Sequence, residues 1–148
     1  MEQGSDVLVI HPTIQFSAIL LALYVFYLGL HRFRFLHLHQ KAVFQWRRHV
    51  VLGEIAMGVL LAGMLGGMAM VYVYWHGFLI TGIHGKVGLA TVPFILFGLG
   101  SGLYMNRGKK QRRILAFVHG LNNLFVLLMA MSQIVSGWWL YKAFVLGG

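Results

Sequence analysis

The chain has 148 residues, of which 59% are hydrophobic and 10% charged, whereas soluble domains carry about 25% charged residues. Twelve Lys and Arg against three Asp and Glu give a net charge of +9, and ten of the twelve basic residues fall between hydrophobic segments, five in each of two groups. This composition excludes an ordinary soluble domain and predicts that the chain lies in a lipid bilayer. No nucleic-acid partner is expected, because the positions of the basic residues indicate membrane topology. The absence of cysteine excludes cysteine-ligated iron–sulfur clusters and covalent haem attachment through C-x-x-C-H.

Four segments are each apolar over the roughly 20 residues that a membrane-spanning helix needs. Taken in chain order, the expected helices cover about 7–31, 42–74, 83–106 and 112–146. The predicted fold class is an all-α integral membrane protein, a single four-helix bundle over residues 1–148. The positive-inside rule places both basic groups in the cytoplasm and both termini on the extracytoplasmic side.

A histidine lies near the start of each apolar segment: His11, His49, His84 and His119. The second helix is expected to begin around 41–44, which would bring His49 to a depth similar to that of His119. A histidine in lipid costs free energy, so intramembrane histidines usually have a partner or a ligand. Each of the four is therefore a candidate metal ligand, and the alternative for each is a buried or interfacial residue hydrogen-bonded to a neighbour.

The predicted topology sorts these histidines into two pairs from alternate helices. His11 and His84 fall near the extracytoplasmic face, and His49 and His119 near the cytoplasmic face. The iron of haem b takes one imidazole on each face, and bis-histidine ligation suits electron transfer. The sequence therefore predicts two bis-histidine haem b groups. His76, in the outer loop, is the alternative to His11 as a metal ligand.

Further residues are expected around these groups. Gln15, Gly53, Gly88 and Asn123 each lie four residues after a candidate ligand and so share its helix face. The glycines would clear room for a macrocycle, the amides could contact haem, and Lys86 could pair with a haem propionate.

Two groups of polar residues each have two possible roles. Glu54, the only acid within the apolar segments, is expected to be buried, either as a proton-transfer group beside a quinone or as a neutral structural carboxyl. His31, His37 and His39 are expected in the cytoplasmic loop, solvated or facing lipid. The alternative is contact with a substrate or a haem propionate.

Residues 79–92, LITGIHGKVGLATV, resemble the cytochrome b561 helix that carries a ligand histidine just before a Gly-Leu-Ala step. The resemblance implies a core of four helices with two b haems on opposite sides of the membrane, ligated by histidines of alternate helices. It covers the whole bundle in layout and is specific around His84. His11-Pro12 departs from the family pattern, and no counterpart of the family's ascorbate-binding basic motif is present.

The expected function is electron transfer across a membrane, as a subunit of a membrane oxidoreductase. The expected partners are a quinone or quinol and a periplasmic c-type cytochrome or other redox subunit, and the expected location is a bacterial inner membrane. One alternative is a transmembrane ferric or ascorbate-linked reductase. An alternative of another class is a cofactor-free membrane scaffold or transporter subunit.

Overall fold

The computed structural model describes residues 5–108, 110 and 112–147. These residues form α1 (Ser5–His37), α2 (Trp46–Trp75), α3 (Ile83–Arg107) and α4 (Arg113–Tyr141), and α4 continues as the π-helical turn η1 (Lys142–Leu146). All four helices are long and apolar enough to cross a membrane. The prediction of an all-helical chain with four membrane-length helices is confirmed for the described residues.

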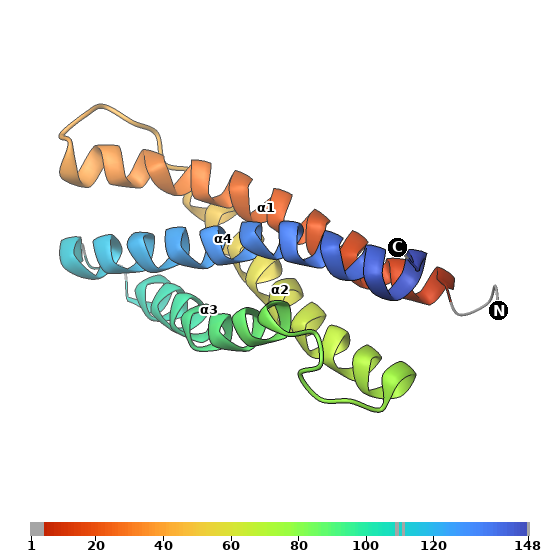
Figure 1. Cartoon of the computed structure of the whole chain (residues 1–148). Helices are drawn as coiled ribbons and strands as arrows, with labels where there is room; N and C mark the ends of the chain where they lie inside the picture. The colour runs from red at the N-terminus through yellow and green to blue at the C-terminus, as the bar shows by residue number, and fades with distance from the viewer. Residues whose placement is uncertain (1–4, 109, 111, 148) are drawn as a thin grey trace.

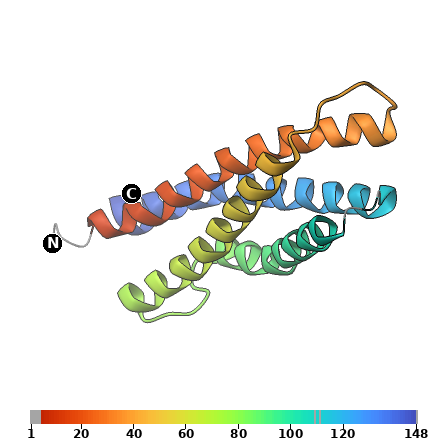
Figure 2. The ribbon, with the colours of Figure 1, turned by 180° about the vertical axis from the view of Figure 1, so that it is seen from behind.

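The four helices run alternately up and down and form a ring (Figures 1 and 2). α1 packs against α2, α2 against α3, and α3 against α4, and α4 closes the ring against α1. α1 begins and α4 ends at the same end of the bundle as the α2–α3 connection. We call this the terminal end. Short connections from α1 to α2 and from α3 to α4 bring residues of both basic groups to the other, basic end.

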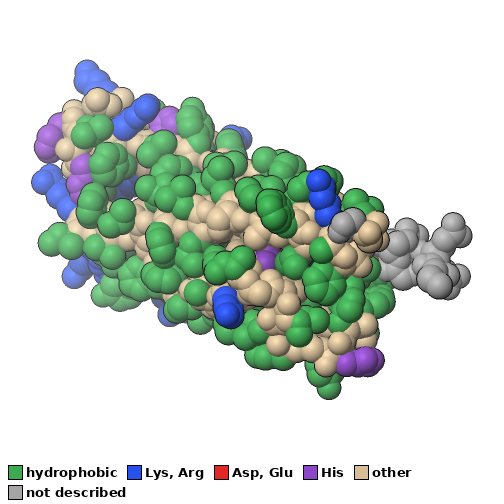
Figure 3. Space-filling model, in the orientation of Figure 1, with side chains coloured by type: hydrophobic (Ala, Val, Ile, Leu, Met, Phe, Trp, Pro, Cys, Tyr) green, Lys and Arg blue, Asp and Glu red, His purple; other side chains and the backbone are tan. Residues whose placement is uncertain are grey.

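The surface of the bundle is consistent with contact with lipid. Large hydrophobic side chains such as Leu20, Leu65 and Leu128 are more than half exposed, and Figure 3 shows hydrophobic side chains along the flank of the molecule. Most of the visible Lys and Arg side chains gather where α1 ends and α4 begins. An apolar belt of this extent is typical of a membrane-embedded surface rather than of a soluble monomer.

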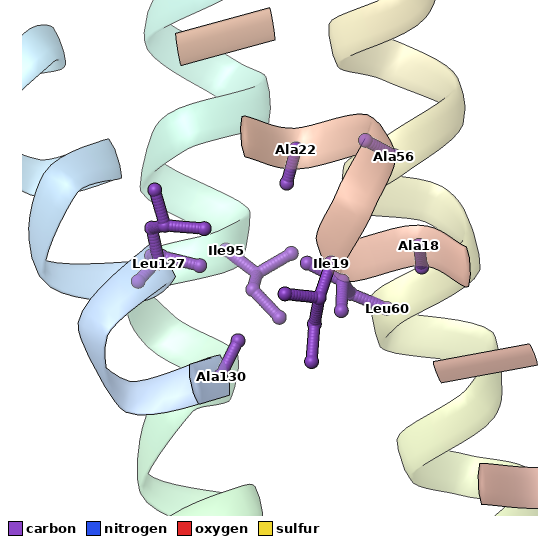
Figure 4. Close-up of a cluster of buried hydrophobic side chains, with 9 residues drawn as sticks. Ala18, Ile19, Ala22, Ala56, Leu60, Ile95, Leu127 and Ala130 are labelled. Atoms are coloured by element: carbon purple, nitrogen blue, oxygen red, sulfur yellow. The ribbon is translucent and has the colours of Figure 1, made fainter. Parts of the chain in front are cut away.

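A compact core joins the helices midway along the bundle (Figure 4). Its buried members are small or branched aliphatic side chains from all four helices: Ala18, Ile19, Ala22, Ala56, Leu60, Ile95, Val126, Leu127 and Ala130. Small residues at these contacts allow the helix backbones to approach closely, which is how helices associate within lipid. The core therefore holds the middle of the bundle together.

Two helix boundaries differ from those expected at the basic end. α1 continues to His37, six residues beyond the expected end at 31, because nothing in residues 32–37 breaks a helix where the apolar run stops. α2 begins at Trp46 and not at 42. At the helical rise, these six residues make α1 about 9 Å longer than expected. Residues 38–45, which have no helical structure, therefore run back along α1 to reach the start of α2.

The membrane orientation is testable by labelling, since the chain has no native cysteine. We expect Lys110→Cys at the basic end to react with an impermeant maleimide only from the cytoplasm. Phe78→Cys, at the exposed α2–α3 connection, should react only from outside. Labelling of intact and of permeabilised cells measures both, and the reverse pattern would invert the bundle.

Candidate functional site

The bundle brings the four intramembrane histidines together as two pairs across its diagonals. His11 on α1 faces His84 on α3, with ring centroids 6.5 Å apart and ring planes at 79°. His49 on α2 faces His119 on α4, with centroids 6.3 Å apart and planes at 70°. These are the pairs that the predicted topology placed in the same half of the membrane.

Each pair lines a cavity. The terminal-end cavity, with His11 and His84, has a volume of about 700 Å³, and the basic-end cavity, with His49 and His119, has a volume of about 930 Å³. Ligand pockets in proteins usually occupy about 300–1,000 Å³. Leu60 of the core borders both cavities. The core therefore divides the interior into two compartments.

Hydrogen bonds fix the tautomer of His119. The Ser101 hydroxyl donates to the Phe97 carbonyl at 2.7 Å, and His119 Nδ1 lies 2.8 Å from the same hydroxyl oxygen. Since the hydroxyl proton is already directed to the carbonyl, Nδ1 is the donor to Ser101 and Nε2 carries the lone pair. The Asn123 amide donates to that lone pair at 2.9 Å.

His84 and His49 are held in the same way. The Ser136 hydroxyl donates to the Ser132 carbonyl at 3.2 Å, so His84 Nδ1 is the donor to Ser136 at 3.0 Å. His49 Nδ1 donates directly to the Val25 carbonyl at 3.1 Å. A ligand histidine typically donates its second ring nitrogen to such a group, which orients the other nitrogen toward the metal. Three of the four rings therefore have Nε2 available as a ligand.

His11 is anchored differently. Its Nδ1 is buried and has no hydrogen-bond partner among the described residues. The ring lies so close to Gly67 that a Cβ there would be 2.6 Å from Cε1. Packing against Gly67 therefore holds this ring in place.

Every one of the four rings lies against a glycine of the neighbouring antiparallel helix. The pairs are His11–Gly67, His49–Gly29, His84–Gly137 and His119–Gly102. A Cβ added at Gly29, Gly137 or Gly102 would lie 3.2 or 3.3 Å from Cε1 of the ring, which is tighter than nine in ten real Cβ contacts. The histidine–glycine contacts join α1 to α2 and α3 to α4, so each of these helix pairs forms a hairpin. The histidine pairs then join the two hairpins across the bundle.

The contact of these four glycines with the histidine rings was not predicted, although a regular spacing marks it in the sequence. On every helix the glycine follows the histidine by 18 residues, as in His11 and Gly29. Eighteen residues make five full helical turns, so both lie on one face about 27 Å apart. In α3 and α4 a serine precedes the glycine, and Ser101 and Ser136 are the hydroxyls described above. The pattern H-x17-G, repeated four times, was the available signal.

Four of the five predicted cofactor-binding residues line a cavity, and Lys86 does not. Gln15 and Gly88 line the terminal-end cavity, and Gly53 and Asn123 line the basic-end cavity. Gln15 also donates from Nε2 to the Leu60 carbonyl at 3.2 Å. Lys86 is exposed on α3 and does not line either cavity, so the prediction of its propionate contact has no support.

Glu54 is not buried as expected. Its side chain is exposed at the margin of the basic-end cavity, because five residues turn it about 140° around α2 from His49. His76, the rival to His11, is exposed at the C-terminus of α2 and lies outside the terminal-end cavity.

The remaining histidines lie at the basic end. His31 and His37 are part of α1 rather than of a loop, and His39 follows the helix with a positive φ of 52°. His37 lines the basic-end cavity and His31 does not. His37 is therefore a cavity residue and is not simply solvated or facing lipid, which leaves the alternative expectation of contact with a substrate or a haem propionate open.

Charge is distributed unevenly between the two compartments. Arg32, Lys110 and Arg112 line the basic-end cavity, whereas no described Lys or Arg lines the terminal-end cavity. Within the part of the chain that the structure describes, no three His, Cys, Asp or Glu side chains come together to hold a metal ion. In each cavity only one pair of imidazoles lies face to face across the bundle, so a metal between them needs its remaining ligands from a cofactor.

Comparison of the chain with protein-family models, curated proteins and solved structures finds no match. The resemblance to cytochrome b561 therefore rests on the residues of this sequence alone.

The tautomer assignment is testable by ¹⁵N NMR of histidine-labelled protein without metal. We expect His119 to show a protonated Nδ1 and an unprotonated Nε2, because Ser101 and Asn123 impose these roles. Ser101→Ala should weaken this bias at His119, because only the Asn123 contact would remain, and should leave the His84 signals unchanged. A protonated Nε2 at His119 in the unmutated protein would contradict the assignment.

Proposed function

We propose that this chain is a dihaem b-type cytochrome that transfers electrons across a membrane. The observation that carries the proposal is the distance between the imidazoles of each pair. A metal–imidazole bond is about 2.0–2.1 Å and a ring centroid lies about 1.2 Å behind its nitrogen, so two imidazoles on opposite faces of one metal have centroids roughly 6.4 Å apart. The two pairs have centroid distances of 6.5 and 6.3 Å.

The surroundings of the rings support the same function. Nε2 of His49, His84 and His119 carries the lone pair that a metal requires, because Nδ1 is the hydrogen-bond donor. Iron bound to His119 would replace the Asn123 amide, which has rotatable bonds to turn aside. A bis-histidine haem b supplies a one-electron carrier without an open coordination position.

The chain's own residues would set the charge and the separation of the two sites. Arg32, Lys110 and Arg112 lie where they could neutralise propionates in the basic-end cavity. The core beside Leu60 keeps the two sites apart while dividing the roughly 30 Å hydrocarbon thickness into shorter steps.

For the partners, we propose a lipid quinone or quinol on one side and an extracytoplasmic redox protein, such as a periplasmic c-type cytochrome, on the other. The support is the setting of the site: four helices of membrane length surround two separate cavities. A bacterial inner membrane fits the distribution of basic residues.

A second candidate is an ascorbate-linked or ferric reductase. The specific observation in its favour is the set of three basic side chains, Arg32, Lys110 and Arg112, which would attract an anionic reductant to the basic-end cavity. Reduction of the purified protein by ascorbate but by no quinol would favour this candidate.

Ligand substitutions test the two haem sites. We expect about two haems per chain in the wild type and about half that content in His49→Ala or His119→Ala, with the same spectral component lost in both. His11→Ala and His84→Ala should lose the other component. The measurement is reduced-minus-oxidised absorption with haem quantification. A colourless wild-type protein would exclude the proposal, and loss of one component by both His49→Ala and His84→Ala would exclude the pairing.

A glycine substitution tests the site without removing a ligand. Gly102→Val should displace the His119 ring and reduce the basic-end haem content several-fold, because even a Cβ at this position would lie 3.3 Å from the ring. Gly100→Val is the matched control on α3, since a Cβ there meets nothing within 4 Å. Equal haem loss in the two variants would show that the ring–glycine contact has no specific role.

A further inference from the structure

We propose that the basic-end cavity contains a binding site for the head group of a lipid quinone, in which His37 holds a quinone oxygen and exchanges its proton. This inference rests on the proposed function, which supplies the electron partner. It gives the quinone a place in the structure and assigns the proton transfer to His37 instead of Glu54.

The first observation is an unsatisfied nitrogen. Nε2 of His37 is buried and has no hydrogen-bond partner among the described residues. His37 is the last residue of α1 and lines the basic-end cavity. A buried polar group without a partner is unfavourable, and in native proteins such a group calls for an explanation such as a ligand. A quinone carbonyl or hydroquinone hydroxyl provides the missing hydrogen bond.

The second observation is the pair of aromatic rings packed against the His37 ring. The Phe33 ring lies 5.1 Å from the His37 ring, and the Phe117 ring lies 5.6 Å from it. The two phenyl rings are 6.4 Å apart, and all three residues line the cavity. An apolar, aromatic pocket with a few well-placed polar groups is typical of a small-molecule site. A flat, mostly apolar ring with an oxygen at each end fits it.

The third observation is the position of these aromatic rings relative to the candidate haem ligand. Phe117 precedes His119 by two residues on α4, and both line the same cavity. Arg32 lies 5.7 Å above the Phe44 ring, at the same end of the cavity. The compartment around His37 therefore lies toward the basic end from the histidine pair, where a bound head group would be a neighbour of the haem.

The chemistry balances without a further reagent. When a hydroquinone is oxidised, its two O–H bonds break and its two C–O bonds become carbonyls, which releases two electrons and two protons. A haem held by His49 and His119 would accept these electrons one at a time. The proton of the hydroxyl that His37 holds passes to His37 Nε2 and from there to water at the basic end, and the proton of the opposite hydroxyl is released to water. A positioned histidine is the commonest group for such transfer.

The test uses the purified full-length protein with its haems in detergent and a short-chain ubiquinol, and stopped-flow absorption follows haem reduction. We expect His37→Phe and His37→Gln to slow reduction by about 100-fold, the typical contribution of a proton-transfer group. His31→Phe is the matched control, because His31 also lies near the end of α1 but bonds to the Tyr27 carbonyl through Nδ1 at 3.1 Å and lines neither cavity. It should react at the wild-type rate.

A photoreactive azidoquinone tests binding without relying on haem. We expect labelling near Phe33 or Phe117 in the wild type, in His31→Phe and in His37→Gln, which keeps hydrogen-bonding capacity, and loss of labelling in His37→Phe. Unchanged labelling in His37→Phe would overturn the site, and a wild-type reduction rate in His37→Gln would overturn the proton transfer. A change of haem content in His37→Phe with unchanged quinol kinetics would overturn the proposal in favour of a propionate contact.

These outcomes separate the inference from the proposed function. A protein that binds two haems but shows no effect of His37 substitution retains the proposed function and loses the quinone site. A protein without haem loses the proposed function, and the electron transfer fails with it. The photolabelling result then decides whether His37 forms a quinone-binding site.

Discussion

The close approach of an imidazole ring to a glycine on the adjacent helix is the contact on which the interior of this bundle depends. It occurs four times, twice in each hairpin, and it sets how near the helices lie where the histidines enter. At three of the rings, a hydrogen bond at Nδ1 on the same neighbouring helix adds orientation to this packing. Two hairpins built in this way then place their rings opposite one another across the diagonals. The geometry of the candidate metal sites follows from contacts that hold the helices together.

The repeated spacing explains why one design serves both halves of the membrane. Because 18 residues bring a helix back to the same face after five turns, each helix presents a histidine to one cavity and a glycine to the other. Each cavity therefore receives two rings from one diagonal pair of helices and two glycines from the other pair. The compartments differ in charge, since Arg32, Lys110 and Arg112 line only one of them among the described residues. The common framework and the unequal charge are independent features of the sequence.

Much of this arrangement could be predicted from the sequence, and the features that were not predicted have physical explanations. Apolar length and basic loops predicted four helices and their alternation, and one histidine per helix then predicted which rings share a half of the membrane. Hydropathy does not mark where a helix ends outside lipid, so the continuation of α1 to His37 was not predicted, nor was the helical position of His37 beside the basic-end cavity. Glu54 was expected to be buried because it is an acid in an apolar segment. Its face on α2 left it exposed, and the 140° separation from His49 already pointed that way.

The aliphatic core between the two cavities treats electrons and protons differently. An electron can tunnel through a layer of alanine, leucine and isoleucine side chains, but a proton needs a chain of polar groups or water. The nine buried side chains that form this core offer none, and Leu60 borders both compartments. Under the proposed function, an electron that crosses this layer leaves its proton behind on the side where it was released. Each transfer would then move net charge across the membrane, so that this small bundle would contribute to the membrane potential.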